Sequence, residues 1–262
     1  MDLELAGKRA LVTGSYRGTG AGLARVLARE GASVFVHGFE RDAAEEVAGS
    51  IRDEGLEARA VVGDIRNDEG GREVAEAVGE IDVLVNNYGV AEGGSWESPT
   101  GDWIDIYQKN VLSGVRLVHA LVPGMKERGW GRVLFVSTVG YVRPSSRMPH
   151  YYASKTALIN MTVSLAKELA NTGITVNCIS PGVIATAEIR EMTRRRAEKA
   201  GEPTDWPSLE KAIASGDMAN PAGIVGDPED IGHLVAFLAS DKARYINAAN
   251  VRIDGGTADS IQ

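Results

Sequence analysis

Two neighbouring tyrosines, Tyr151 and Tyr152, precede Lys155 in the stretch "PHYYASKTAL" (149–158). A phenol can exchange a proton with a carbonyl oxygen, but its ordinary pKa of about 10 makes it a poor acid–base group at neutral pH. A nearby ammonium group favours the phenolate and lowers that pKa. On a helix the i,i+4 and i,i+3 spacings both bring side chains close together, so spacing alone leaves open which tyrosine pairs with the lysine.

A glycine-rich stretch near the start could bind a phosphate group. "ALVTGSYRGTGAGLA" runs from a strand pattern into a helix pattern through Gly14, Gly18 and Gly20. Glycines let the backbone turn sharply and approach a pyrophosphate, and the start of a helix offers unpaired N–H groups to an anion. No G-K-[ST] follows, so the stretch does not predict a nucleotide-hydrolysing P-loop. A tight turn without a ligand has the same pattern, so this stretch alone is weak evidence.

The elements that must position these residues alternate between short β-rich runs and amphipathic helical patterns. The strand runs are apolar on both faces, as in a parallel sheet that helices cover on both sides. This pattern predicts an α/β fold with one doubly wound parallel sheet of about seven strands. The expected strands are 9–13, 33–37, 57–63, 82–87, 132–137, 175–180 and 250–254.

Residues 186–224 interrupt this alternation with about two helices' worth of charged and apolar sequence between the last two strands. Long insertions of this kind are often lids or binding loops, which favours a substrate lid. The alternative is a solvated helical insertion with an exposed charged face. No low-complexity linker divides the chain, so residues 1–262 are expected to form a single domain.

Charge and composition exclude several classes of partner. The 262 residues hold 28 basic and 36 acidic side chains, a formal net charge of −8, which argues against nucleic acid or an anionic membrane. No run approaches about 18 apolar residues, and the single cysteine, Cys178, cannot form an internal disulfide, so we expect a cytoplasmic protein. The four histidines are scattered, and no metal site is predicted.

Seven motifs occur in the order found in short-chain dehydrogenases/reductases: "TGSYRGTG", "GDI", "NNYG", "KNV", Tyr151 to Lys155, "SPGVIAT" and the late "DGG". The resemblance covers nearly the whole chain and implies a Rossmann-type fold. The family pattern Y-x-x-x-K decides between the tyrosines: it implies that Tyr151 is the acid–base group and that Tyr152 is a packing neighbour. Lys155 would then tune Tyr151 and hold the ribose hydroxyls.

The same resemblance implies two further catalytic residues. Thr138 occupies a slot where serine is usual; it keeps a hydroxyl, but its methyl group narrows the pocket. Ser137 should face the other side of the strand. Asn110 resembles the family residue that opens a helix kink and holds a water feeding the lysine. Tyr88, where alanine is usual, either restricts substrates or has no consequence.

The resemblance also implies a dinucleotide site. Asp64 and Ile65 would flank the adenine, Asn87 and Gly89 would line the cofactor trough, and Ile184 with Thr186 would hold the nicotinamide amide. The full predicted cofactor-binding set is Gly14, Tyr16, Arg17, Gly18, Thr19, Gly20, Phe39, Asp64, Ile65, Asn87, Tyr88, Gly89, Tyr151, Lys155, Pro181, Gly182, Ile184 and Thr186.

The end of the second strand bears on the choice of cofactor. Enzymes selective for NAD usually carry an acid there that bonds the ribose 2′-OH, and the matching position is Gly38. Arg17 and Arg41 could pair with a 2′-phosphate, whereas Glu40 argues against one. The sequence therefore favours NADP(H) over NAD(H).

These features predict an NADP(H)-dependent oxidoreductase of the ketoreductase type that interconverts a ketone and a secondary alcohol. Its partner is a small, partly apolar carbonyl or alcohol substrate. The resemblance implies a homotetramer or homodimer, with helices 103–128 and 152–172 at one interface. Two alternatives remain open: an NAD-linked alcohol dehydrogenase of the same family, and a cofactor-binding sensor or scaffold that turns over slowly. The unusual residues Thr138 and Tyr88 are the reason that the sensor or scaffold alternative stays open.

Overall fold

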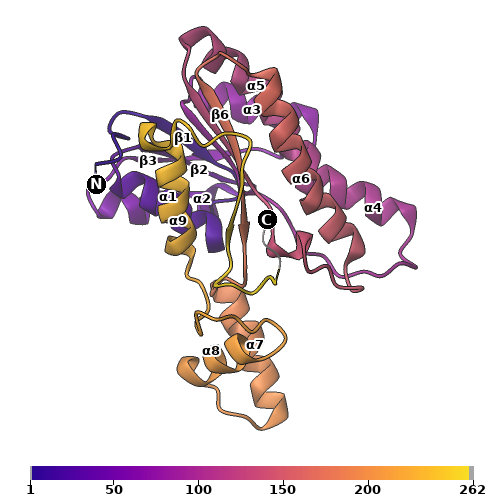
Figure 1. The fold of residues 1–262 in the computed structure, drawn as a ribbon. Coiled ribbons are helices and arrows are strands. Elements are labelled where there is room, and N and C mark those ends of the chain that lie inside the picture. Colours follow the sequence, from indigo (N-terminus) through magenta and orange to yellow (C-terminus); the bar gives the residue numbers. More distant parts are fainter. Residues whose placement is uncertain (1, 260–262) are drawn as a thin grey trace.

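A single seven-stranded parallel sheet forms the centre of the computed structural model, which describes residues 2–259 (Figure 1). The strand order is β3-β2-β1-β4-β5-β6-β7, and every neighbouring pair is parallel. All seven predicted strands are present, and no strand end differs from the prediction by more than one residue. The strands are β1 (Arg9–Val12), β2 (Ser33–Gly38), β3 (Ala58–Val62), β4 (Val83–Asn86), β5 (Gly131–Val136), β6 (Ile174–Pro181) and β7 (Asn250–Ile253).

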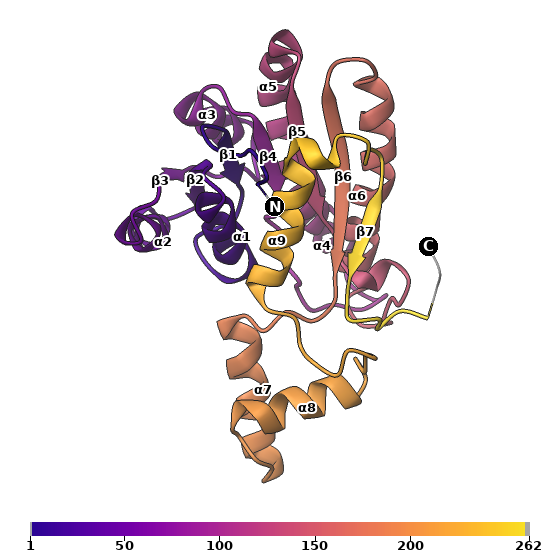
Figure 2. The same cartoon turned by 60° about the vertical axis from the view of Figure 1, so that its left-hand side comes forward.

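Helices cover both faces of the sheet, which confirms the doubly wound fold (Figure 2). One face packs against α1 (Gly18–Arg29), α2 (Arg41–Asp53) and α9 (Pro228–Ala239). The other packs against α3 (Asp68–Val78), α5 (Ser113–Arg128) and α6 (Pro149–Glu168). Within residues 2–259, no helix is both long and apolar enough to cross a membrane.

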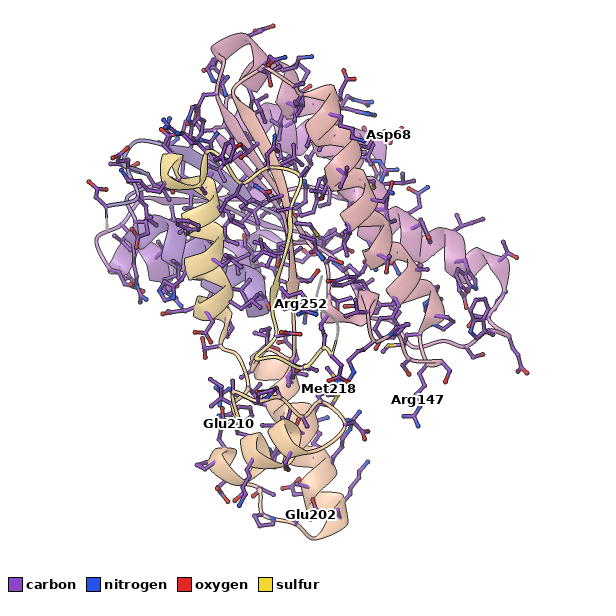
Figure 3. All side chains as sticks on the ribbon, viewed as in Figure 1. Asp68, Arg147, Glu202, Glu210, Met218 and Arg252 are labelled. Carbon is purple, nitrogen blue, oxygen red and sulfur yellow. The ribbon has the colours of Figure 1, made fainter. Side chains whose placement is uncertain are left out.

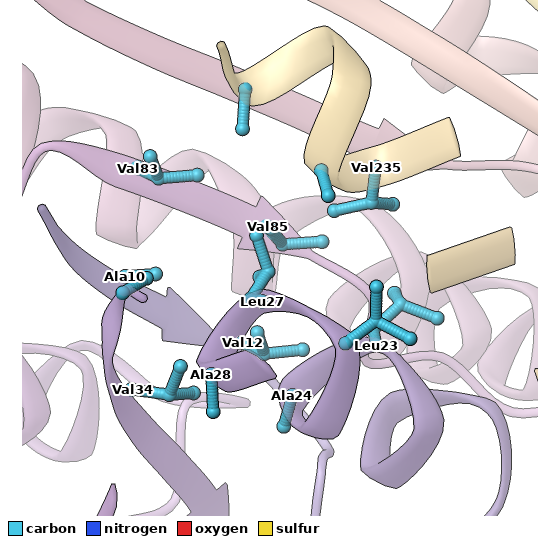
Figure 4. Packing of buried hydrophobic residues seen from close by; sticks show 14 of the residues in the cluster. Ala10, Val12, Leu23, Ala24, Leu27, Ala28, Val34, Val83, Val85 and Val235 are labelled. Carbon is cyan, nitrogen blue, oxygen red and sulfur yellow. The ribbon is translucent and has the colours of Figure 1, made fainter. Parts of the chain in front are cut away.

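Each face has its own apolar core. On the first face, Leu23 and Leu27 of α1 pack toward Val12, Val85 and Val235, and none of these five side chains is exposed (Figure 4). Truncating such a leucine to alanine removes buried apolar surface and leaves a cavity, which typically costs about 2–5 kcal/mol. This packing holds the strands whose carboxyl ends carry the site.

The strand order reverses beside β1, which has β2 on one side and β4 on the other. In doubly wound sheets, ligands bind in the crevice outside the carboxyl ends of the strands at this reversal. The glycine-rich stretch and "NNYG" leave β1 and β4 at this edge, and the segments after β5 and β6 leave the sheet beside them. The topology therefore gathers most of the predicted site residues at one edge.

A helix irregularity marks the position of Asn110. Helix α4 (Thr100–Tyr107) continues through the π-helical turn η1 (Gln108–Leu112) directly into α5. An extra residue in a helical turn displaces the side chains around it, and such turns are frequent at functional sites. This distortion lies where the resemblance implied a helix kink. Two short 3₁₀ turns complete the elements, η2 (Val139–Tyr141) and η3 (Asp241–Ala243).

The segment predicted as an insertion contains α7 (Ala187–Ala200) and α8 (Trp206–Ser215), which project from the carboxyl edge of the sheet (Figures 1 and 2). Arg190 connects this pair to the body. Its guanidinium stacks 3.7 Å from the ring centroid of Trp206, and its Nε donates to the carbonyl oxygen of Ala185 at 3.1 Å. Few side chains of the two helices are buried, namely Ala197, Leu209 and Ala214.

Candidate active site

A cleft of about 630 Å³ runs along the carboxyl edge of the sheet from the glycine-rich loop to the start of α7. It brings together residues as far apart in the chain as Gly14 and Met218. The predicted residues that line it are Gly14, Tyr16, Arg17, Gly18, Thr19, Gly20, Asn87, Tyr88, Gly89, Thr138, Tyr151, Lys155, Pro181, Gly182, Ile184 and Thr186.

The glycine-rich loop joins β1 to α1 in a conformation that larger residues could not adopt. Gly14 and Gly18 have φ values of +61° and +55°. A Cβ on Gly20 would lie 2.5 Å from the carbonyl oxygen of Gly14 and 2.6 Å from Nδ2 of Asn87. No side chain caps the start of α1, and no acidic residue lies in its first turn. The unpaired backbone N–H groups in the first turn of α1 therefore suit the pyrophosphate of a dinucleotide.

His37, near the end of β2, holds the glycine-rich loop in place through a hydrogen bond. Its side chain is fully buried; Nδ1 accepts from the backbone N–H of Gly14 at 3.0 Å, and Nε2 lies 3.0 Å from the carbonyl oxygen of Gly63. Because Nδ1 is the acceptor, the ring proton sits on Nε2 and is donated to Gly63. Burial lowers the pKa of His37 to about 4, which keeps the ring neutral. Ser15 supports it, since its Oγ accepts from the N–H of His37 at 2.9 Å.

Three aromatic rings pack together beside the glycine-rich loop, and two of them, Tyr16 and Tyr88, line the cleft. The ring of Phe39 makes edge contacts with Tyr88 at 5.0 Å and Tyr16 at 6.2 Å between centroids. Phe39, Asp64 and Ile65 do not line the cleft: Asp64 forms a bidentate ion pair with Arg66, and Ile65 is buried in the core. The Arg66 guanidinium also lies 4.9 Å above the ring of Phe39.

Tyr88 therefore points toward the glycine-rich loop and Phe39. Its Cα and ring lie 3.1–3.2 Å from where a Cβ of Gly14 would be, and burial raises its pKa to about 12. A neutral, packed phenol explains how a tyrosine replaces alanine here: it completes the aromatic group at the end of β2. The residue beside it, Asn87, donates from Nδ2 to the carbonyl oxygen of Thr13 at 2.8 Å.

The end of β2 carries no carboxylate toward the cleft. A Cβ on Gly38 would lie 3.0 Å from Cβ of Tyr16, so the tyrosine already fills the space beside it. Arg17 pairs with Glu188 of α7 at 3.2 Å, and both side chains are about half exposed. The cation nearest the glycine-rich loop is thus shared with the lid. Arg41 lies at the exposed start of α2.

Tyr151 lies in the first turn of α6, which begins at Pro149. It lines the cleft together with Thr138, the residue that follows β5 by two positions. Burial raises the pKa of Tyr151, and the nearby Thr138 hydroxyl opposes that rise. Tyr152 packs beside it with ring centroids 5.2 Å apart and lies against Gly140, where a Cβ would collide with its ring.

Lys155 is buried under the cleft floor. Its Nζ donates to the carbonyl oxygen of Val136 at 2.9 Å, and a Cβ on Gly89 would lie 2.5 Å from this nitrogen. Burial lowers the pKa of Lys155 to about 8, so the ammonium form still predominates at pH 7. The expected lowering of the Tyr151 pKa is not the net direction in this structure, because burial is the largest influence on the phenol.

The two hydroxyls after β5 point to different places, as alternation along a strand predicts. Ser137 is buried and donates from Oγ to the carbonyl oxygen of Lys155 at 2.7 Å, so its hydroxyl is committed to the backbone of α6. The hydroxyl of Thr138 accepts from the N–H of Gly140 at 3.2 Å, and Thr138 lines the cleft together with Tyr151.

Asn110 does not line the cleft but is buried directly behind it. Its Oδ1 accepts from the N–H of Val90 at 2.7 Å, and its Nδ2 donates to the carbonyl oxygen of Val90 at 3.1 Å and to Oγ of Ser154 at 3.0 Å. The π-helical turn thereby ties the loop after β4 to the helix that carries Tyr151 and Lys155.

Comparisons with known proteins agree with this geometry. Residues 14–258 match the family described as enoyl-(acyl carrier protein) reductase. The chain is 35% identical to "Dehydrogenase/reductase SDR family member 4" of Sus scrofa, over 98% of this chain and 89% of that protein. It is 32% identical to the 3-oxoacyl-[acyl-carrier-protein] reductase FabG of Pseudomonas aeruginosa, over 97% and 98% of the two chains. This chain belongs to the short-chain dehydrogenase/reductase family.

A solved structure extends the match to three dimensions. The L-sorbose reductase of Gluconobacter frateurii, complexed with NADPH and L-sorbose, superposes with a TM-score of 0.93 over all of both chains at 31% identity. As a short-chain dehydrogenase/reductase, the protein is an NAD(P)-dependent oxidoreductase. Its relatives differ in the substrates that their names state, so family membership leaves the substrate open.

Sequence reasoning missed several residues of this short-chain dehydrogenase/reductase. Val139 and Met148 line the cleft near Tyr151, and Glu188, Ile189 and Met218 reach it from the lid segment. The lid was predicted only as a segment, because a helical insertion does not reveal which side chains turn toward the sheet. His37 had a usable signal: a histidine inside an apolar strand must be hydrogen-bonded once it is buried. Within residues 2–259, no group of acidic, histidine or cysteine side chains could hold a metal ion.

Proposed function

We propose that this protein transfers hydride between NADP(H) and a ketone or secondary alcohol, with Tyr151 as the proton donor and acceptor. The observation that carries the proposal is that Tyr151 and Thr138 both line the cleft that begins at the glycine-rich loop. Two hydroxyls placed together in this way can hold one carbonyl oxygen between them. A dinucleotide extending from the glycine-rich loop would reach them along the cleft.

The bound cofactor would supply or accept the hydride at its nicotinamide ring, and this chain supplies the proton. Because burial raises the pKa of Tyr151, the phenol is protonated at pH 7, which suits proton donation during ketone reduction. Thr138 orients the substrate oxygen with its hydroxyl. Its methyl group limits rotation about χ1 and keeps the hydroxyl in place.

Lys155 would act as the fixed positive charge beneath the cofactor ribose. With a pKa of about 8 it carries that charge at pH 7 and loses it as the pH rises through 8. Asn110 would support the return of a proton to the lysine, because it binds both the Val90 backbone and Ser154 next to that site. The order of protonation would then run from solvent past Asn110 to Lys155 and Tyr151.

The preference for NADP over NAD is also our proposal. Gly38 places no carboxylate where a 2′-phosphate would lie, and Arg17 lines the cleft beside the loop. The L-sorbose reductase structure holds NADPH, and a second similar structure, from Beutenbergia cavernae and 33% identical, has bound NADP. Glu188 weakens the preference, because it already neutralises part of the charge of Arg17.

We further propose a cytoplasmic homotetramer with residues 186–224 as its lid. Exposed apolar side chains on α4, η1 and α6 favour a second copy on that face: Ile104 is 59% exposed, Leu112 36% and Val163 37%. The lid assignment is supported by Ile189 and Met218, which reach the cleft from the segment. Sedimentation equilibrium of the wild type beside Val163→Glu would test the assembly, with dissociation expected for the variant.

The deciding experiment follows NADPH oxidation with a panel of ketones for the wild type and Tyr151→Phe, while NADPH binding is measured by fluorescence. Turnover lost in the variant with binding unchanged supports the enzyme. Binding without turnover in both proteins supports the sensor or scaffold. Repeating the titration with NADH, and with Arg17→Ala, separates the NADP-dependent enzyme from an NAD-linked alcohol dehydrogenase.

A further inference from the structure

A second cavity, of about 330 Å³, lies beside the cleft between α8, the 216–226 segment and the ends of α9 and β7. Val183, Ile184 and Met218 line both spaces, so the cavity and the cleft adjoin at these residues. Figure 3 shows Met218 where the lid joins the body of the molecule. We propose that this cavity receives an uncharged apolar tail of the substrate, with Met218 as the side chain that tail must pass. The inference rests on the proposed ketone–alcohol chemistry and names its substrate class.

The surface of the cavity is mainly apolar. Ile213 comes from α8, Ile224 from the segment after it, and Ile253 from the end of β7. Ile224 is 55% exposed, so it lies where the cavity opens toward solvent. Methionine is flexible and adapts to irregular apolar partners, so Met218 suits a passage better than a rigid side chain would.

The polar groups of the cavity are already engaged with the protein. Asp254 accepts from the N–H groups of Gly256 and Ala258 at 3.0 and 3.1 Å, and Asp230 accepts from the N–H of Asp227 at 2.7 Å. Polar ligands need such groups for orientation and specificity. These contacts use part of the acceptor capacity of the two carboxylates, and most of the remaining lining is apolar, so an alkyl or aryl group matches more of the cavity surface than a sugar would.

Two further polar side chains of the cavity also form hydrogen bonds within the protein. Asn220 donates to the carbonyl oxygen of Ile224 at 2.9 Å and accepts from the N–H of Gly223 at 3.0 Å, and Thr257 donates to the carbonyl oxygen of Asp254 at 2.8 Å. His233, which also lines the cavity, is exposed on α9 and faces solvent.

Charge excludes an anionic tail. None of the described residues that line the cavity is a lysine or arginine, while Asp230 and Asp254 are both carboxylates. A carboxylate or phosphate on the substrate would meet like charges without a compensating cation. The chemical class that fits is therefore a ketone or secondary alcohol whose longer arm is neutral and apolar.

A chain-length series tests the proposal. Linear 2-ketones from four to twelve carbons should show kcat/KM rising about fourfold per added methylene, the value expected from about 0.8 kcal/mol of buried surface, until the cavity is filled. The ω-carboxylate of a long member should lose this gain. Ile224→Trp, at the half-exposed mouth, should lower kcat/KM about tenfold for long ketones and leave the four-carbon ketone unchanged.

Met192→Trp is the matched control, because Met192 is an exposed apolar residue of the lid outside both cavities. Calorimetry of decan-2-ol binding to the NADP⁺-loaded protein gives a readout that does not need turnover. Ile224→Trp should weaken this binding, whereas Met192→Trp should leave it unchanged. Equal rates along the ketone series, or equal loss for short and long ketones in Ile224→Trp, would overturn the tail site. Activity retained in Tyr151→Phe would instead overturn the proposed function, so the two failures are distinguishable.

Discussion

The two ends of the cleft are built by different means. At the nucleotide end, partly buried hydrogen bonds join the ends of neighbouring strands: Gly14 donates to His37, Asn87 donates to Thr13, and Tyr88 donates its N–H to Oγ1 of Thr13 at 2.9 Å. At the lid end, exposed groups hold two helices in place, through the Arg17–Glu188 ion pair and the stacking of Arg190 on Trp206.

This difference suggests that cofactor binding depends on a fixed geometry, whereas the choice of substrate can vary. Hydrogen bonds that are shielded from water are costly to break and hold a loop in one geometry, as a pyrophosphate site needs. Exposed ion pairs are worth about 0–1 kcal/mol, so substitutions that remove them from α7 and α8 should cost little stability. Cofactor binding should therefore tolerate few substitutions, while the lid should tolerate many and mainly change which substrates react.

The largest expected effect tests the rigid end. Gly20→Ala places a Cβ 2.5 Å from the carbonyl oxygen of Gly14, so the loop must shift and the cofactor dissociation constant should rise at least about 100-fold. Fluorescence titration with NADPH measures it. Gly101→Ala is the matched control, because a Cβ there meets nothing within 4 Å. Equal affinity in both variants would show that the loop is not the pyrophosphate site.

The acid stability of the protein tests the histidine behind that loop. The pKa of His37 is about 4 when folded and about 6.5 when unfolded, so between these values the unfolded chain binds more protons. The stabilisation is complete above pH 6.5 and is lost as the pH falls through 4, by about 3 kcal/mol in total.

Urea unfolding between pH 7 and pH 4 measures this loss. His37→Gln should flatten the pH dependence in this range, whereas His119→Gln, at an exposed histidine, should leave it as in the wild type. A wild-type stability that stays constant from pH 6.5 to 4 would contradict the neutral, loop-holding role of His37.

At the junction of the two ends, Thr138→Val keeps the shape of the side chain and removes its hydroxyl. Because one donor to the reacting oxygen is lost, kcat should fall about 10–100-fold with cofactor affinity unchanged. Thr138→Ser should keep at least a third of the wild-type rate. Steady-state kinetics at saturating NADPH compares them, and equal rates for valine and threonine would remove Thr138 from the site.

The smallest effect belongs to the lid end. Glu188→Gln frees Arg17 from its exposed partner, so NADPH should bind up to about fivefold more tightly, the range of a surface ion pair. NADH affinity should stay the same, which serves as the internal control. A gain that is equal for both cofactors would mean that Arg17 does not contact a 2′-phosphate.

The sequence predicted the nucleotide end better than the lid, for the same physical reason. Apolar runs and glycines directly encode parallel strands and tight turns, so β1, β2 and the loop between Val12 and Gly18 were predictable from local pattern. The choice of Tyr151 over Tyr152 needed the family resemblance, since both spacings fit a helix. The partners of Arg17 and Met218 depend on how α7 and α8 pack on the body, which no local pattern specifies.

The burial of Tyr151 and Lys155 could not be predicted from the sequence either. The expectation that a neighbouring ammonium would make Tyr151 acidic considered charge alone, whereas in the structure desolvation raises the pKa of Tyr151 and lowers that of Lys155 to about 8. Both shifts require the three-dimensional enclosure formed by β5, α6 and the loop after β4.

A crystal structure of the protein with NADP⁺ and a secondary alcohol tests the central claim most directly. The account predicts the dinucleotide along the cleft with its pyrophosphate at Gly18–Gly20, and the alcohol oxygen within hydrogen-bond distance of both the Tyr151 and Thr138 hydroxyls. An alcohol oxygen bound by other groups, with the Tyr151 hydroxyl turned away from the nicotinamide ring, would contradict it.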